Sequence, residues 1–344
     1  KSLFKKSLAT GHNHLENNYY LGICYRETGK AKAWIIQKLD YRQSEKSFQI
    51  VLQQDSLFKD VLYQWALLSR YRGEYEAAIQ NCQEQIRLKP HLYIPRLNLY
   101  RLYRYFITHR SLEEVFIWLH QHPWPESRYF WGEKLRREGK SSRADSDFLD
   151  LLKGPVDLPA QPVLISLAKI NYQSGNVKAA ERYFWQSVNQ IHSRLEADLI
   201  FEELKYIVST HEYQHYDTLD TARQFREFFR NFWFRRNPVP SFPSNVRLTE
   251  HFRRLLYAEK NYEYDGFRLW SDNPDKLQEL EFPDTHFLNQ EFNDKGLVYI
   301  RQGDPDKRVS TVAADLPTNE SWLYYASRDV PQLSYHFILT KPDN

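Results

Sequence analysis

A short pattern of small and aromatic residues recurs in the first half of the chain and limits the folds that this half can adopt. One copy is Gly73-Glu-Tyr-Glu-Ala-Ala78, which is followed by Cys82, and another is Gly175-Asn-Val-Lys-Ala-Ala180, which is followed by Phe184. A weaker copy begins at Gly139, 36 residues before Gly175. That distance is close to the period of about 34 residues at which helix pairs repeat in solenoid proteins. The pattern therefore predicts a stack of paired helices.

The repeated pattern resembles the tetratricopeptide (TPR) repeat. Its Gly-x-Tyr-x-x-Ala spacing, closed by Pro90, is similar to the second helix of such a repeat, and the segment from Leu62 to Tyr71 matches the first helix. We expect roughly five units within residues 1–191, in which small residues let paired helices approach closely. A TPR-like α-solenoid presents a concave surface to peptides or protein elements. The alternative is a spacer that binds nothing.

Three tryptophans fall in the middle of the predicted array, and two interpretations are open for them. Trp118, Trp124 and Trp131 could line a groove that binds a partner. Large aromatic side chains more often bury their area, so the core is the favoured interpretation for these residues.

The bulk composition excludes several classes of protein. The chain has 344 residues with 47 basic and 44 acidic side chains, a balance that gives no sign of a nucleic-acid partner. Its two cysteines, Cys24 and Cys82, form no C-x-x-C pair, so they predict buried small residues and no thiolate zinc module. No apolar run is long enough to span a membrane. The chain lacks methionine, so we expect Lys1 to be a processed or truncated start.

The period of the sequence changes after residue 191, which predicts a second domain over residues 192–344. Helices are expected first, and alternating apolar residues then predict a small antiparallel sheet. The fold class is therefore mainly α, with an α-solenoid followed by a smaller α+β domain. The expected helices are Leu195–Val208, Glu212–Trp233 (capped by Ser209 or Thr210) and Val246–Tyr262, and the expected strands are Leu297–Arg301, Ser321–Ala326 and Leu333–Leu339.

Several landmarks follow one another over about 196–339, and they include Phe232-Trp233, Asn293-Asp294 and Gly303-x-Pro305-Asp306. In their order these landmarks resemble the bacterial GWxTD family. At the motif that names the family this chain has Gln290-Glu-Phe-Asn-Asp294, which keeps only the final aspartate. We expect Trp233, Asn293, Asp294, Gly303, Pro305 and Asp306 to be structural.

The resemblance also carries expectations about location and partners. Members of this family often accompany TPR repeats and bacterial envelope targeting, and no biochemical activity of the family carries over. The resemblance implies a periplasmic or outer-membrane-associated protein whose partners are other protein subunits. Contact with a membrane would then come through a partner or a lipidated N-terminus.

One short motif has the form of a zinc site. His211-Glu212-Tyr213-Gln214-His215 matches H-E-x-x-H, in which two histidines on one helical face bind zinc and the glutamate acts on a water molecule. The preceding Ser209-Thr210 is a helix N-cap signal, which places His211 in the first turn. Asp217 stands where zincins have a hydrophobic residue. We therefore retain zinc binding by His211 and His215 only as an alternative.

Other charged residues have competing interpretations. Asp304 and Asp306, with Asp294, could bind a cation, although a proline-aspartate turn explains the first two. Arg235 and Arg236 could clamp a carboxylate of a partner, or could pair with Glu227 or the last carbonyls of their helix. The sequence contains no phosphate loop and no recognisable nucleophile-base pattern.

These observations favour a non-enzymatic scaffold or adaptor without a cofactor. A zinc-dependent hydrolase built on His211, Glu212 and His215 is the first alternative. A module that binds a peptide or a glycan through exposed aromatic residues is the second, because aromatic residues make up 16% of the chain.

Overall fold

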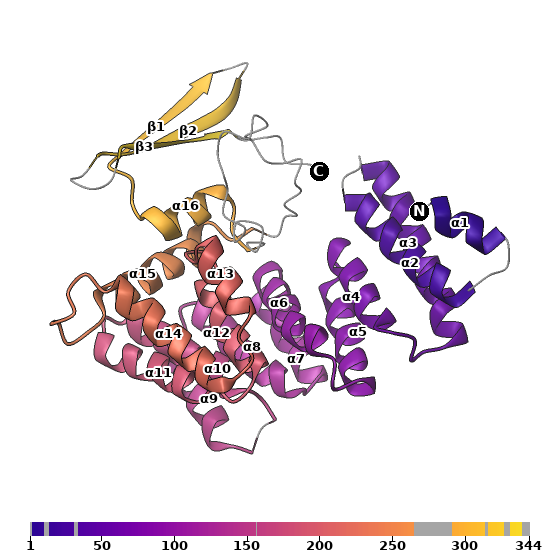
Figure 1. The fold of residues 1–344 in the computed structure, drawn as a ribbon, viewed down its shortest axis with the longest axis horizontal. Coiled ribbons are helices and arrows are strands. Elements are labelled where there is room, and N and C mark those ends of the chain that lie inside the picture. Colours follow the sequence, from indigo (N-terminus) through magenta and orange to yellow (C-terminus); the bar gives the residue numbers. More distant parts are fainter. Residues whose placement is uncertain are drawn as a thin grey trace. The chain divides into compact units, whose positions relative to one another are not determined.

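The structure, a computed structural model, describes residues 2–9, 14–30, 34–155, 157–264, 291–313, 316–326 and 331–338 (Figure 1). These residues are mainly helical, and a small antiparallel sheet lies near the C-terminus, as the sequence predicted. The chain forms two compact units, Lys1–Val163 and Leu164–Asn344.

The first unit consists of consecutive helices that pack in antiparallel pairs. In two of these pairs, His14–Lys30 with Trp34–Gln54 and Pro125–Arg137 with Ser141–Lys153, a glycine on the first helix faces an aromatic ring on the second. A Cβ added at Gly22 would lie 2.4 Å from the ring of Phe48, and one at Gly132 would lie 2.6 Å from the ring of Phe148. The helices are α1 Ser2–Ala9, α2 His14–Lys30, α3 Trp34–Gln54, α4 Val61–Tyr71, α5 Tyr75–Leu88, α6 Tyr93–His109, α7 Leu112–Gln121, α8 Pro125–Arg137, α9 Ser141–Lys153 and α10 Ala160–Gln173, whose first residues belong to this unit.

The second unit begins within α10 and continues as five further helices before residue 262. They share one core, in which Ala168 and Phe184 pack in the same cluster as Trp233 and Phe252. The helices are α11 Val177–Asn189, α12 Arg194–Leu204, α13 Thr210–Asp217, α14 Ala222–Arg236 and α15 Val246–Asn261. The pair α10 and α11, which carries a copy of the repeated pattern, is therefore continuous with the core of the C-terminal helices.

The helix expected over Glu212–Trp233 is divided in the structure, so that prediction was wrong. Thr221 starts a new helix with a capping box, in which its side chain accepts from the backbone of Gln224 and Gln224 reaches back to Thr221. This reciprocal cap satisfies the first amide groups of α14 and ends the continuity with α13. Ser209 forms the same kind of box with Glu212 at the start of α13, as expected.

The segment Leu297–Arg301, expected to be a strand, is part of helix α16 (Asp294–Gln302). Asn293 caps this helix by accepting from the amide of Gly296 at 2.9 Å. Leu297 and Ile300 lie on one helical face and enter the core of the second unit. Packing at this helical spacing outweighs the β propensity of the Val-Tyr-Ile run.

The sheet has three antiparallel strands in the order β1-β2-β3. Their bounds are β1 Lys307–Ala313, β2 Leu316–Tyr324 and β3 Leu333–Ile338. The sequence predicted the last two strands in part and missed β1, which pairs with β2 so that Arg308 lies opposite Trp322. Trp322 is fully buried and packs on Phe337 of β3.

Buried ion pairs fix the inside of the second unit. The ammonium group of Lys169 donates to Glu203 at 3.0 Å and to Glu259 at 2.8 Å. The ammonium group of Lys205 donates to Glu291 at 3.0 Å, and both side chains are almost completely buried. Such pairs are costly to break, because removal of one partner leaves a buried charge without compensation.

A carboxyl group with a raised pKa joins α12 to α13. The hydroxyl of Tyr216 donates to Asp198 at 2.5 Å, and burial raises the pKa of Asp198 to about 7. Arg194 lies 3.2 Å from the same carboxyl group.

Within the described residues, no helix has the length and apolar character needed to cross a membrane, in agreement with the sequence.

Candidate functional site

A groove in the second unit combines one exposed and one half-buried aromatic ring with amide groups and one arginine. It lies between α11 and α14 and has a volume of about 460 Å³. The described residues that line it are Trp185, Arg230, Asn231, Phe234, Asn237 and Asn245, and none of them carries a carboxylate. The groove can therefore accept an apolar side chain and offers amide groups to a polar backbone.

Helix α14 positions the groove because its aromatic residues divide between two faces. Phe225, Phe229 and Trp233 recur at intervals of four and are buried in the core. Phe234 falls outside this stripe, and 72% of its surface is exposed. Sequence analysis missed this groove, although the displacement of Phe234 from the apolar stripe was the signal that could have revealed it.

The polar residues of the groove have partly defined positions. One nitrogen of the Arg230 guanidinium donates to the side-chain oxygen of Asn189 at 2.7 Å, and its other nitrogens bond to no described residue. Asn245 caps α15 and donates from its side chain to the carbonyl of Trp233 at 2.9 Å. Its backbone amide donates to Glu181 at 2.5 Å, so this carboxylate beside the groove is already engaged.

The two arginines at the end of α14 have different surroundings. Arg235 is exposed. Arg236 forms a bidentate ion pair with Glu212, with both N–O distances 2.7 Å, and its guanidinium lies 3.8 Å from the ring centre of Phe232. Of the two internal pairings that were expected, the one with Glu227 is not formed, and Glu227 pairs with Arg223. The one with helix carbonyls is formed by Arg236, which donates to the carbonyl of Phe232 at 3.4 Å.

The H-E-x-x-H motif is arranged as a helix start. His211 and His215 are exposed, and Glu212 closes the capping box with Ser209. Burial disfavours the ionised form of Glu212, but hydrogen bonds from Arg236 and Ser209 outweigh it and lower the pKa of this carboxyl. Among the residues that the structure describes, no three His, Cys, Asp or Glu side chains gather as a metal site would require. Glu212 is thus held as a cap and ion-pair partner.

The three tryptophans of the first unit separate into two groups, and each is half-buried. The rings of Trp118 and Trp124 both pack on His122, with ring centres 4.4 Å and 5.0 Å from the imidazole, and they also contact each other at 5.9 Å between ring centres. Trp131 packs instead on Phe116, at 5.2 Å between ring centres. Phe116 and its neighbour Ile117 remain exposed, so this part of the unit also presents apolar surface.

The residues expected to be structural in the GWxTD-like domain lie at helix ends, in the core and at a turn. Trp233 is fully buried, and Asn293 caps α16. Asp294 is the first residue of α16, where its charge favours the helix dipole. Of the stretch that matches the naming motif, Gln290 lies outside the described residues, and Glu291 is the buried partner of Lys205.

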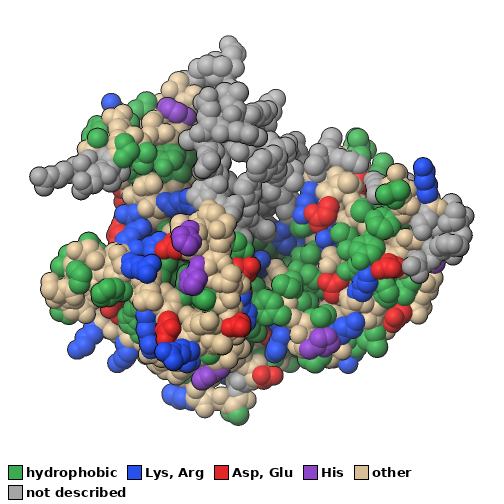
Figure 2. Space-filling model, in the orientation of Figure 1, with side chains coloured by type: hydrophobic (Ala, Val, Ile, Leu, Met, Phe, Trp, Pro, Cys, Tyr) green, Lys and Arg blue, Asp and Glu red, His purple; other side chains and the backbone are tan. Residues whose placement is uncertain are grey.

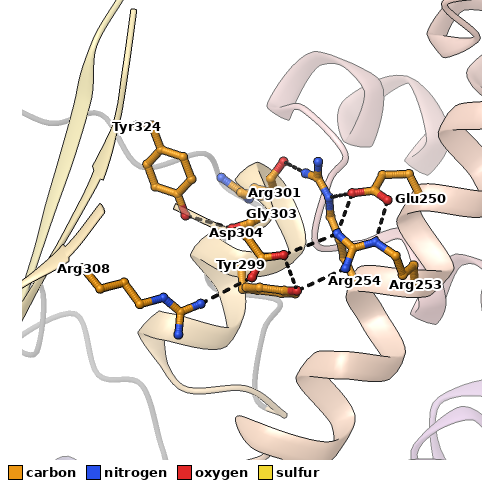
Figure 3. Close-up of polar contacts among 9 residues, drawn as sticks. All are labelled: Glu250, Arg253, Arg254, Tyr299, Arg301, Gly303, Asp304, Arg308 and Tyr324. Atoms are coloured by element: carbon orange, nitrogen blue, oxygen red, sulfur yellow. Dashed lines mark hydrogen bonds and ion pairs between the residues drawn. The ribbon is translucent and has the colours of Figure 1, made fainter. Parts of the chain in front are cut away.

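Figure 3 shows the polar contacts that join α15, α16 and the sheet around Gly303. Arg254 donates to Glu250 at 2.6 Å and to the carbonyl of Arg301 at 2.8 Å. The hydroxyl of Tyr324, on β2, donates to the carbonyl of Gly303 at 3.0 Å. Gly303 has φ 85° and ψ −154°, a conformation that is essentially restricted to glycine.

The aspartates after α16 are engaged by protein groups. Asp304 accepts from the hydroxyl of Tyr299 at 3.1 Å and pairs with Arg308 at 3.4 Å. Asp306, after Pro305, accepts from the backbone amide of Tyr325 at 2.6 Å. These contacts hold the turn that leads into β1, and Asp294 is not part of them.

No protein-family model matches the chain, and a comparison with curated proteins finds no significant match. The resemblances to TPR repeats and to the GWxTD family therefore stay predictions.

Proposed function

We propose that this protein is a non-enzymatic protein-protein interaction scaffold of a bacterial cell-envelope assembly. The observation that carries the proposal is the groove between α11 and α14, where Phe234 and Trp185 stand beside amide groups and Arg230. Exposed aromatic residues, an arginine and amide groups are typical of protein-binding surfaces. The envelope setting comes from the GWxTD-like landmarks, and the paired helices are consistent with a repeat scaffold.

The polar groups support binding better than catalysis. Glu212 is occupied by Ser209 and Arg236, so it does not stand free beside His211 and His215 as a general base for zinc hydrolysis would. Asp304 is likewise engaged, by Tyr299 and Arg308. The groove, in contrast, leaves hydrogen-bonding groups and an aromatic ring open to a partner.

Crosslinking followed by mass spectrometry, in membranes from cells that make the full chain, tests the proposal. We expect the same neighbouring proteins in independent preparations, with crosslinks to exposed lysines of the chain. A chain that is recovered alone as a monomer would overturn the scaffold function. Stoichiometric zinc that is lost in a His215→Ala variant would instead support the hydrolase.

A further inference from the structure

The face that surrounds the groove carries an excess of positive charge. On α11, Lys178, Arg182 and Trp185 recur at helical spacing and therefore share a face. On α14, Arg230 and Arg235 are exposed next to Phe234. In Figure 2, hydrophobic side chains gather at the left edge over the loop from α14 to α15, and Lys and Arg side chains lie just below them.

The carboxylates near this face have partners within the protein. Glu181 accepts the backbone amide of Asn245, and Glu227 pairs with Arg223 at 2.8 Å. Glu181 keeps its negative charge, but the exposed Lys and Arg side chains of α11 and α14 outnumber it, so the face is cationic on balance. A peptide with basic residues would meet like charge here, whereas carboxylates would meet guanidinium groups with matching geometry.

The apolar part of the face is too extended for a small anion. Val239, Phe242 and Val246 are exposed along the loop and the start of α15, next to the strongly exposed Phe234. A contiguous apolar surface with a polar rim marks a protein-binding site on a soluble protein. The side-chain amide of Asn231, which lines the groove, can bond to both the N–H and C=O groups of a peptide backbone. The side-chain oxygen of Asn237 already accepts from the backbone amide of Val239, so Asn237 offers its NH₂ group to a C=O group.

We propose that the groove between α11 and α14 binds an acidic segment of a partner protein that inserts an apolar side chain between Trp185 and Phe234. This inference rests on the proposed scaffold function, because it names the kind of partner. Arg230, at the groove, pairs with a carboxylate of the segment, and Arg182 and Arg235 attract further acidic residues.

Four pools of fluorescein-labelled nine-residue peptides test the inference by fluorescence anisotropy with the full chain. The pools combine acidic, basic or neutral flanks with a central apolar residue, and the fourth has acidic flanks with a central serine. We expect the acidic pool with the apolar centre to bind at least about tenfold more tightly than the other three. Its affinity should fall as salt is raised, because the attraction between exposed charges is screened.

Two variants with matched controls locate the binding. Arg230→Glu and Phe234→Ala change exposed side chains. Each is expected to lower the affinity of the chain for the acidic pool about tenfold or more. Lys307→Glu reverses an exposed charge on β1, outside the groove, and Leu57→Ala removes an exposed apolar side chain in the other unit. Both controls should leave binding unchanged, and thermal unfolding should show that all four variants fold.

Several outcomes would overturn the inference. One is that the basic or neutral pool binds as tightly as the acidic pool, or more tightly. Another is that no pool binds at 1 mM peptide, a concentration that corresponds to a binding free energy of about 4 kcal/mol. A third is that neither groove variant weakens the binding. Binding of a chitin-derived oligosaccharide that is lost in Trp185→Ala, with no binding of the acidic pool, would assign the groove to a glycan. If neighbouring proteins crosslink only to residues 1–155, the scaffold function would be supported, but the groove would not be the binding site.

Discussion

Substitution of Gly303 by alanine is expected to weaken the joint between α16 and the sheet for two separable reasons. The first is the backbone, because φ 85° with ψ −154° lies in a region that is nearly restricted to glycine, at a cost of about 1–3 kcal/mol for other residues. The second is steric. An added Cβ would lie 2.8 Å from the Cζ atom of Arg254, whose guanidinium is bound to Glu250 and to the carbonyl of Arg301.

The steric part has a magnitude that follows from those hydrogen bonds. A hydrogen bond that involves a charged group contributes about 1.5–3 kcal/mol, and displacement of the guanidinium loses the equivalent of one such bond. The total expected loss of stability for Gly303→Ala is therefore about 2.5–6 kcal/mol. Gly175 provides the control, because it has φ 78° and no atom within 4 Å of an added Cβ. Gly175→Ala should cost only about 1–2 kcal/mol.

Hydrogen exchange at the amides of α16 and β2 is the suitable measurement, since a chain with two compact units need not unfold in one step. Faster exchange is expected in Gly303→Ala, and far less change there in Gly175→Ala. In an Arg254→Ala background the steric part disappears, so the two substitutions should be coupled by about 2 kcal/mol. Equal effects of Gly303→Ala and Gly175→Ala, or additive effects with Arg254→Ala, would refute the role of Arg254.

Three further substitutions test the interior of each unit. Asp198→Asn should flatten the pH dependence of stability. The pKa of Asp198 is about 7 in the folded protein and 3.8 in the unfolded chain, so the folded protein holds the proton more tightly. The free energy of unfolding of the parent chain therefore falls by up to about 4 kcal/mol as pH rises between these two values. Hydrogen exchange at the amides of α12 and α13 from pH 4 to 8, corrected for the intrinsic exchange rate at each pH, measures this, and a slope equal to that of the parent chain would contradict the assignment. Lys169→Met leaves two glutamates buried without their partner and should cost about 3–5 kcal/mol by the same assay, whereas the exposed Lys153→Met should change little. Gly132→Ala places a Cβ 2.6 Å from the ring of Phe148 and should cost about 1–3 kcal/mol, measured by hydrogen exchange at the amides of α8 and α9.

The fold class could be predicted because the signals that define it are local. For example, Gly132 of α8 lies against Phe148 of α9, and the two residues are only 16 positions apart in the sequence. Helix α15 was predicted to within one residue, because Asn245 precedes it and its apolar residues follow helical spacing. Close helix packing and capping are short-range effects, and therefore a single sequence is enough to show them.

Helix α16 could not be predicted in the same way, because its conformation depends on distant residues. Val298, Tyr299 and Ile300 favour a strand when they are considered alone. The structure stabilises the helix through the cap at Asn293 and through the buried face of Ile300, which packs in a core shared with α12, α14 and α15. The core that Ile300 joins is built from residues up to 135 positions earlier in the chain, and no local pattern contains it.

At the candidate site, too, the residue types could be found from the sequence, whereas their surroundings could not. The same α14 that was expected to offer Arg235 and Arg236 to a partner uses Arg236 for an internal ion pair and leaves Phe234 exposed. The motif His211-Glu212-x-x-His215 has the letters of a zinc site, but Glu212 is occupied as a helix cap. Which of several similar side chains is free depends on tertiary contacts, which a motif does not specify.

The size of the groove also limits how tightly it can bind by itself. Burial of one exposed phenylalanine ring contributes about 1.5–3 kcal/mol, and a rim ion pair at Arg230 adds up to about 1 kcal/mol. Micromolar binding requires about 8 kcal/mol, so most of the affinity must come from the peptide backbone contacts and from further apolar contacts along Val239 and Phe242. A segment held only by this groove should exchange readily. A stable assembly therefore needs a second contact elsewhere on the chain, because two linked weak contacts can exceed either one by a factor of about 10²–10⁴.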